Sequence, residues 1–162
     1  MSGFKTALSF GAIVLSLAIS ASAMELTTNG GFETGDTSGW VSFPTANSTF
    51  LITSDAASGN WAAEVFNNDL ASSAVVKQAN LGIGVVNPGD LIEVSFAAKG
   101  EGVVGGVVFA EFFSEIDGGG TSAGEILGGG PLTLPAVSDP YGNFSFTTVA
   151  GPDVSGGVTL QF

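Results

Sequence analysis

The sequence predicts an all-β protein built as a β-sandwich or barrel. Three observations support this class: short apolar runs recur along the chain, turn residues separate them, and no long segment repeats its apolar residues at the helical period. The 25 glycines correspond to about twice the average glycine usage. Because 44% of the 162 residues are hydrophobic and 11% are charged, the chain has enough apolar side chains for the core of one domain.

The expected strands follow the apolar runs in chain order. They are Glu25–Thr28, Trp40–Phe43, Thr49–Ser54, Trp61–Phe66, Ser73–Gln78, Leu91–Ala98, Val103–Ile116, Asn143–Val149 and Val158–Phe162. Clusters of Gly, Pro, Asn and Asp between these runs predict turns. The segment Ala123–Leu127 is expected to form one helical turn at most, because glycines flank it on both sides.

The clearest strand, Val107–Ile116, separates two kinds of side chain, because successive residues of a strand project to opposite faces. The face predicted to join the core carries Val108, Ala110, Phe112, Ser114 and Ile116. The opposite face carries Val107, Phe109, Glu111, Phe113 and Glu115. Because this second set mixes aromatic rings with carboxylates, we expect it to be partly accessible to solvent and to contact a ligand or another part of the chain.

Residues 1–23 have the composition of a secretory signal peptide. Lys5 supplies a positive charge, Ala7–Ile19 form an apolar run, and Ala21-Ser22-Ala23 matches an A-x-A cleavage site. An N-terminal membrane anchor is disfavoured, because the run is short for a bilayer span and no positive flank follows it. We therefore expect cleavage before Met24, no membrane insertion afterwards, and a secreted protein that is extracellular or periplasmic.

The charged and reactive residue types exclude several functions. The chain has no Cys and no His, and its basic residues are the three lysines Lys5, Lys77 and Lys99. This composition excludes disulfides, zinc sites of the usual ligands and a histidine base. Residues 24–162 keep two of the lysines and all 15 acidic residues, for a net charge of −13. Nucleic acid is therefore not an expected partner, because few cationic groups are present to bind phosphates.

Four segments after the signal peptide match motifs of one known family in the same order. The opening segment 26–40, LTTNGGFETGDTSGW, matches the consensus N-G-G-F-E-x-G followed by x-x-G-W, and segments 58–65, 88–99 and 156–162 match three later motifs. In these features the chain resembles carbohydrate-binding modules of the family 4/9/22 type. The resemblance implies that residues 24–162 form a galactose-binding-like jelly roll, a β-sandwich of two antiparallel sheets.

The resemblance also implies a structural calcium ion and a further strand. In this family the acidic residue at the position of Glu33 contributes to a calcium site that ties the N-terminal segment to the last strand. Glu33 is therefore the predicted metal ligand, whereas Asp36 is interpreted as a turn former. Family members continue into a strand of the form x-I-D-D-V, which does not occur before Phe162. We therefore expect an incomplete sandwich that either acts alone or precedes a downstream catalytic domain in a longer protein.

The candidate sugar-binding residues are aromatic and acidic side chains. Aromatic rings stack on the C–H faces of sugars, and carboxylates accept hydrogen bonds from hydroxyl groups. The candidates are Trp61, Phe109, Glu111, Phe113, Glu115 and Tyr141. For the four residues of the Val107–Ile116 strand, the alternative is a sheet face covered by a loop.

Three aromatic residues outside that strand have their own alternatives. Trp61 is interpreted first as a core residue and second as a platform at the rim of a sheet. Tyr141 lies in a turn, where it either contacts the ligand or has only a surface position. Trp40 is assigned to the core beneath the opening motif.

The predicted function is non-catalytic binding of a neutral polysaccharide of the β-glucan or xylan kind. The net charge of −13 disfavours anionic polymers as ligands. A pair of carboxylates is enough for glycoside hydrolysis, but a sandwich of this size leaves little room for a deep cleft. The chain is therefore not expected to be an enzyme. The alternative is a structural or adhesive cell-surface or matrix protein that uses the same fold without a sugar site.

Overall fold

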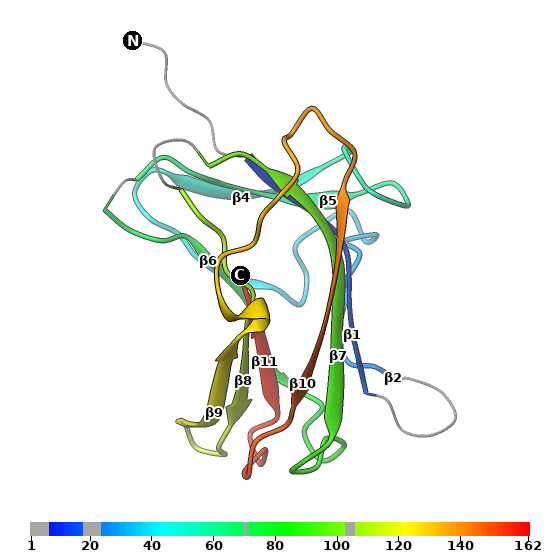
Figure 1. The fold of residues 1–162 in the computed structure, drawn as a ribbon, viewed down its shortest axis with the longest axis vertical. Helices are drawn as coiled ribbons and strands as arrows, with labels where there is room; N and C mark the ends of the chain where they lie inside the picture. Colours follow the sequence, from blue (N-terminus) through cyan, green and yellow to red (C-terminus); the bar gives the residue numbers. More distant parts are fainter. Residues whose placement is uncertain (1–6, 18–23, 70, 103–105) are drawn as a thin grey trace.

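The computed structural model describes residues 7–17, 24–69, 71–102 and 106–162, with side chains described from residue 24 onward. Two antiparallel sheets pack face to face in a β-sandwich, which confirms the predicted fold class (Figure 1). In the described part of the chain, no helix has the length and apolar character needed to cross a membrane.

The first sheet contains six strands in the order β10-β7-β1-β5-β4, with β2 paired to β1. Its strands are β1 (Ala7–Leu17), β2 (Met24–Glu25), β4 (Ser48–Thr53), β5 (Ala62–Asn67), β7 (Leu91–Gly100) and β10 (Gly142–Val149). Every neighbouring pair is antiparallel. Figure 1 shows β7, β10 and β1 as the long strands of this sheet, while β4 and β5 lie across its top.

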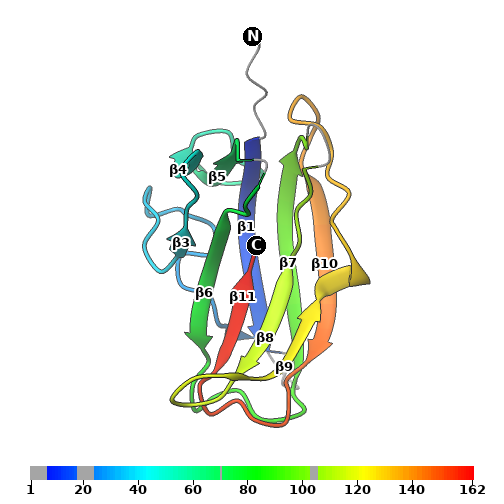
Figure 2. The same cartoon turned by 90° about the vertical axis from the view of Figure 1, so that its left-hand side faces the viewer.

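The second sheet contains five strands in the order β3-β6-β11-β8-β9 (Figure 2). Its strands are β3 (Val41–Phe43), β6 (Val75–Leu81), β8 (Glu111–Glu115), β9 (Thr121–Ile126) and β11 (Val158–Gln161). The chain crosses repeatedly from one sheet to the other, as in a jelly roll. Consequently β11 lies in the middle of the second sheet and brings the C-terminal residues between β6 and β8.

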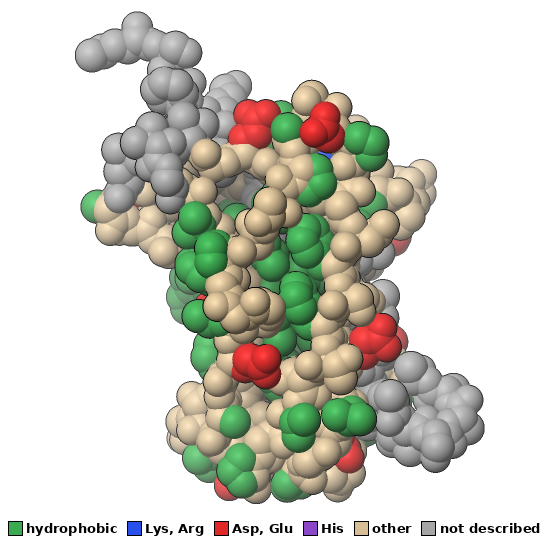
Figure 3. Space-filling model, viewed as in Figure 1, with side chains coloured by type: hydrophobic (Ala, Val, Ile, Leu, Met, Phe, Trp, Pro, Cys, Tyr) green, Lys and Arg blue, Asp and Glu red, His purple; other side chains and the backbone are tan. Residues whose placement is uncertain are grey.

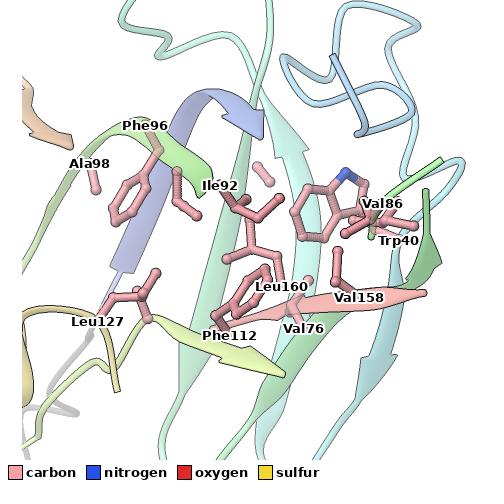
Figure 4. Close-up of a cluster of buried hydrophobic side chains, with 14 of the residues drawn as sticks. Trp40, Val76, Val86, Ile92, Phe96, Ala98, Phe112, Leu127, Val158 and Leu160 are labelled. Carbon is pink, nitrogen blue, oxygen red and sulfur yellow. The ribbon is translucent and has the colours of Figure 1, made fainter. Parts of the chain in front are cut away.

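The core lies between the two sheets and consists of side chains from alternate strand positions (Figure 4). On β7, Ile92, Val94 and Phe96 are at most 3% exposed, and they face Phe112 and Leu160 of the second sheet in the same cluster. Fully burying an aliphatic or aromatic side chain of this size contributes about 1.5–3 kcal/mol. The alternation in the sequence therefore corresponds directly to the packing that stabilises the sandwich.

The predicted strand over Val103–Ile116 is too long. Only Glu111–Glu115 pair as a strand, residues 103–105 lie outside the described part, and residues 106–110 make isolated backbone hydrogen bonds to Leu127 and Leu132. The face assignment is nevertheless confirmed, because Ala110, Phe112 and Ser114 are buried. The pairing of β8 with β9 begins at Glu111, which is opposite Ile126. Beyond Ile126 the chain turns away in a short 3-10 turn over Leu127–Gly129, so the residues before Glu111 have no strand beside them there.

The helical turn considered for Ala123–Leu127 is wrong for most of that segment. Thr121–Ile126 form strand β9, which pairs with β8, and the 3-10 turn begins only at Leu127. Glycines at 118, 119 and 120 have φ values of 80°, 114° and 101°, a region that favours glycine. They therefore let the chain reverse between β8 and β9. This reversal brings Thr121–Ile126, a segment of weak strand propensity, alongside β8, with which it pairs.

Strand β1 lies within the predicted signal peptide. Residues 7–17 pair with β5 on one side and with β7 on the other, so in the full chain this part of the segment belongs to the first sheet. Residues 1–6 and 18–23 lie outside the described part. The removal of residues 1–23 during export is a separate property, and it stays a prediction.

Candidate functional site

The opening motif folds into a tight loop before β3. Asn29 organises this loop, because its side-chain amide donates to the carbonyls of Asp36 and Ser38 and its backbone carbonyl accepts from the Trp40 indole N–H at 3.3 Å. Phe32 and Trp40 are 1% and 7% exposed, and their ring centroids lie 5.4 Å apart. The assignment of Trp40 to the core is therefore confirmed.

Glu33 ties this opening loop to the loop between β4 and β5. One carboxylate oxygen accepts the backbone N–H groups of Asn60 and Trp61, both at 3.1 Å, and the other accepts the Asn60 N–H at 3.0 Å. The hydrogen bonds from Asn60, and then from Trp61, lower the pKa of the Glu33 carboxyl below its ordinary value of 4.5. Glu33 thus acts as a clasp between segments almost thirty residues apart in the sequence.

The calcium ion expected at Glu33 stays a prediction. Calcium is bound by six to eight oxygen ligands, and in this structure the Glu33 carboxylate accepts hydrogen bonds from backbone N–H groups. No group of three or more acidic side chains that could hold a metal occurs among the described residues. Asp36 accepts hydrogen bonds from Thr34 Oγ1 at 2.7 Å and from the Ser38 N–H at 3.0 Å, which agrees with its interpretation as a turn former.

A row of residues crosses the outer face of the second sheet, the sheet seen in Figure 2. The strand registers place Val41, Lys77, Gln161, Glu111 and Ile126 opposite one another on β3, β6, β11, β8 and β9; we call these five residues the outer row. Gln161 Nε2 donates to Glu111 Oε2 at 2.8 Å. Val41 and Ile126 are exposed at the two ends, so a polar centre lies between two apolar margins.

Aromatic side chains flank the outer row. Phe113 is half-buried beside Glu111 on the same face of β8, and its ring occupies the space that a side chain at Gly124 of β9 would need. At the other margin, Phe43 is exposed and Lys77 Nζ lies 5.3 Å from its ring centroid. The outer face therefore presents an amide, a carboxylate and an ammonium group next to rings.

Phe109 and Glu115 are not members of this row. Phe109 precedes β8 and is half-buried. Glu115 follows an irregularity in the pairing of β8 with β9, and its backbone N–H and carbonyl bond to Gly157 and Gly156. Of the four candidates on this strand, the register therefore brings Glu111 and Phe113 into the same small area.

Trp61 and Tyr141 lie elsewhere, near strands of the first sheet. Trp61 is 38% exposed, so its first interpretation as a core residue is wrong, and its ring lies over Gly35 of the opening loop. Tyr141 donates its hydroxyl to the Asp55 carbonyl at 2.6 Å, and its ring lies 4.7 Å from Lys99 Nζ. The six candidate residues therefore do not form one site.

Sequence reasoning missed three residues of the outer face: Lys77, Gln161 and Phe43. Alternation of apolar Val158 and Leu160 with polar Thr159 and Gln161 was enough to place Gln161 on an outer face. Its proximity to Glu111 and Lys77 depends on β11 lying between β6 and β8. No local pattern indicates that pairing, because it is set by crossovers between the sheets.

Comparisons with family models, with curated proteins and with solved structures find no match for this chain. The resemblance of the opening segment to carbohydrate-binding modules therefore stays a prediction. What the structure defines is a class, an antiparallel β-sandwich with a polar and aromatic outer face on its second sheet.

Proposed function

We propose that residues 24–162 form a non-catalytic module that binds a neutral polysaccharide through the outer row and Phe113. The observation that supports this most directly is the hydrogen-bonded Gln161–Glu111 pair, aligned with Lys77 beside a half-buried phenylalanine. Sugar hydroxyls both donate and accept hydrogen bonds. A carboxylate supplies acceptors, an ammonium group supplies donors, and an amide supplies both.

The charge of the protein favours a neutral ligand of the β-glucan or xylan kind. Of the two lysines that follow residue 23, Lys99 forms an ion pair with Asp55 at 2.8 Å, and Lys77 alone belongs to the outer row. The 15 acidic residues surround the protein with a negative potential that repels polyanions.

The proposal does not include bond cleavage. Retaining and inverting glycosidases place two carboxyl groups on either side of the scissile bond. Here Glu111 is engaged by Gln161, and Glu115 lies beyond the pairing irregularity of β8. The outer row is therefore proposed as a binding surface.

We also propose that the protein is exported, with residues 1–23 removed and the remainder secreted or periplasmic. The support is the sequence of that segment alone. Glycan binding at the outer row does not require a calcium ion at Glu33. A downstream catalytic domain in a longer protein is compatible with a module of this kind.

Retention on insoluble polysaccharides and affinity electrophoresis test the proposal. The full chain is compared with Glu111→Gln and Phe113→Ala, and the matched controls are Glu101→Gln and Leu91→Ala, at exposed positions outside the outer row. Loss of one good contact of about 1.4 kcal/mol weakens binding about tenfold, and we expect that loss for the two outer-face variants alone. No retention on any neutral glycan, with circular dichroism showing an intact fold, contradicts the proposal.

The second candidate function is a structural or adhesive surface protein. It is favoured by large exposed apolar side chains, among them Val41, Phe43, Leu51, Ile83 and Leu91. Figure 3 shows hydrophobic side chains along the middle of one face of the molecule. If this function holds, the Phe43→Ser and Val41→Ser variants lose self-association or surface adhesion, while glycan retention is absent in all variants.

A further inference from the structure

The predicted signal peptide contains strand β1, which lies between β7 and β5 in the interior of the first sheet. β1 pairs with β7 from Leu8↔Gly100 to Leu17↔Ile92 and with β5 from Ala7↔Phe66 to Phe10↔Ala63. Cleavage before Met24 removes this strand from between its two neighbours. Rows of backbone N–H and C=O groups on β5 and β7 then lose their partners, and such edges are templates for another strand.

The two sides of the resulting gap are connected by contacts that do not involve β1. A series of rings runs from β7 to β4 through the core: Phe96–Phe162, Phe162–Trp40, Trp40–Phe32 and Phe32–Phe50, with centroid distances of 5.0, 6.4, 5.4 and 6.2 Å. Phe162 and Trp40 also anchor this series next to the second sheet. These contacts hold β7 and β4 in place on either side of the gap.

A second connection runs over the outer side of the same sheet. Lys99 of β7 forms an ion pair with Asp55 of the β4–β5 loop at 2.8 Å, and Tyr141, next to β10, donates to the Asp55 carbonyl at 2.6 Å. Lys99 is 8% exposed, whereas the Asp55 side chain is 59% exposed, so this ion pair is partly accessible to water. The strands on the two sides of the gap are therefore connected both through the ring contacts in the core and through this ion pair on the outer side.

We propose that, after removal of residues 1–23, the gap between β5 and β7 is a strand-acceptor site for an extended segment of a partner protein. This inference rests on the predicted cleavage and is independent of glycan binding. The partner segment adds as a strand antiparallel to β7 along its length and to β5 over the stretch that residues 7–10 occupy, so main-chain hydrogen bonds provide affinity and alternate side chains provide selectivity. Its length matches the 11 residues of β1.

The lining of the gap defines the chemistry of the segment. Ile92, Val94 and Phe96 are buried core residues, and their register partners in β1 are the apolar residues Leu17, Leu15 and Ile13. The partner must therefore carry apolar side chains at these alternate positions. Between them, Glu93 is opposite Ser16 and Ser95 is opposite Val14, so small or β-branched side chains, polar or apolar, suit the intervening positions.

Charge favours a different protein over a second copy of this chain. Two copies that each carry a net charge of −13 after cleavage repel one another at low ionic strength. Glu64 and Glu93 also lie on the strands beside the gap. An uncharged segment such as residues 7–17, which contain no acidic or basic residue, enters without this penalty.

Peptide exchange on the full chain tests the proposal. Residues 18–23 are replaced by a protease recognition sequence, the purified chain is cut there, and the freed N-terminal peptide is removed by dialysis. A labelled synthetic peptide with the sequence of residues 7–17 is then added, and its binding is measured by fluorescence anisotropy. The matched control is the same peptide with Ser9→Pro, which lacks one backbone donor at a position that pairs with both β5 and β7, where proline is excluded.

We expect the unmodified peptide to bind and to restore slow amide hydrogen exchange in β5 and β7, and the proline peptide to bind at least about tenfold more weakly. If the cut chain unfolds when its peptide is removed, refolding by the unmodified peptide but not by the proline peptide also supports the site. Slow exchange in β5 and β7 of a monomeric cut chain without peptide overturns the proposal. Dimers that restore the slow exchange and exclude the peptide identify a second copy as the occupant and also overturn it.

Discussion

Glu33 connects two loops that are distant in the sequence, and it does so with a carboxylate that is exposed to solvent. The N–H groups of Asn60 and Trp61 that bind it also hold the chain reversal before β5 in place. A hydrogen bond to a charged group contributes more than one between neutral groups. At the scale of the residue, the Glu33 side chain therefore acts as a clasp between the two loops.

The clasp makes stability dependent on acid. Because its partners lower the pKa of folded Glu33 below 4.5, its contribution is complete above that value and is lost as the pH falls through the lowered pKa. We expect urea unfolding to show a smaller difference between the unmodified chain and Glu33→Gln below pH 4.5 than at neutral pH. Asp36 and Asp153, whose pKa values are also lowered by hydrogen bonds, titrate in both proteins and cancel in the difference.

The control for this measurement is Glu101→Gln, because Glu101 is exposed and lies in a different part of the chain. We expect that variant to match the unmodified chain in urea unfolding at neutral pH, because Glu101 lies away from the Glu33 contact. An equal loss of stability in Glu33→Gln at acid and at neutral pH contradicts an ionised clasp.

Gly59 offers a second test of the same contact. It has φ +71°, and a Cβ atom there meets the Glu33 carboxylate, whereas Gly84 has φ +73° and open space around a Cβ. Alanine in this left-handed region costs about 1–2 kcal/mol. We expect Gly84→Ala to lower the free energy of unfolding by that cost alone. Gly59→Ala is expected to lower it further, because the new Cβ displaces the Glu33 carboxylate. Thermal unfolding measures both losses. Equal losses in the two variants are evidence against a tight fit of Glu33 at this loop.

At the scale of the element, the β4–β5 loop is held against β7 and β10 by Lys99, Asp55 and Tyr141. The lysine is largely buried and the aspartate is 59% exposed, so the pair is only partly screened by solvent. The tyrosine contributes both a ring to the ammonium group and a hydroxyl to the loop backbone. This arrangement explains why a turn aromatic that the sequence offered as a ligand contact is instead engaged within the fold.

Tyr141→Phe separates these two contributions. The variant keeps the ring beside Lys99 and removes the hydrogen bond to the Asp55 carbonyl, so we expect a loss of about 1 kcal/mol in the free energy of unfolding. Glycan retention is expected to be unchanged, because Tyr141 is not part of the outer face. Reduced retention with unchanged stability places Tyr141 in the binding surface instead.

The strands themselves differ in how well the sequence predicts them. β7 and β10 are apolar or aromatic at alternate positions, and both were predicted within two residues of their bounds. β9 was missed, because Thr121–Ile126 contain few residues that favour strands and are flanked by glycines. It forms a strand because β8 offers a paired edge, which is a tertiary property.

At the scale of the whole molecule, two sheets enclose one core, and each contributes a different kind of surface. The first sheet has its outer side partly covered by the Lys99 contact, whereas the second carries the outer row. Only Glu111 and Phe113 of the six predicted ligand residues are brought together there. The others were chosen by residue type, and residue type does not determine which face or which sheet a side chain reaches.

The sequence by itself determined the all-β class, the alternating core positions of β7 and β8, and the buried Trp40 of the opening motif. These follow from local properties, namely side-chain alternation, turn residues and the burial of large apolar groups. The tertiary structure alone decided that Gln161 lies beside Glu111, that Glu33 binds backbone N–H groups, and that residues 7–17 occupy the interior of a sheet. Each depends on contacts between distant segments, which strand order and register specify and local sequence does not.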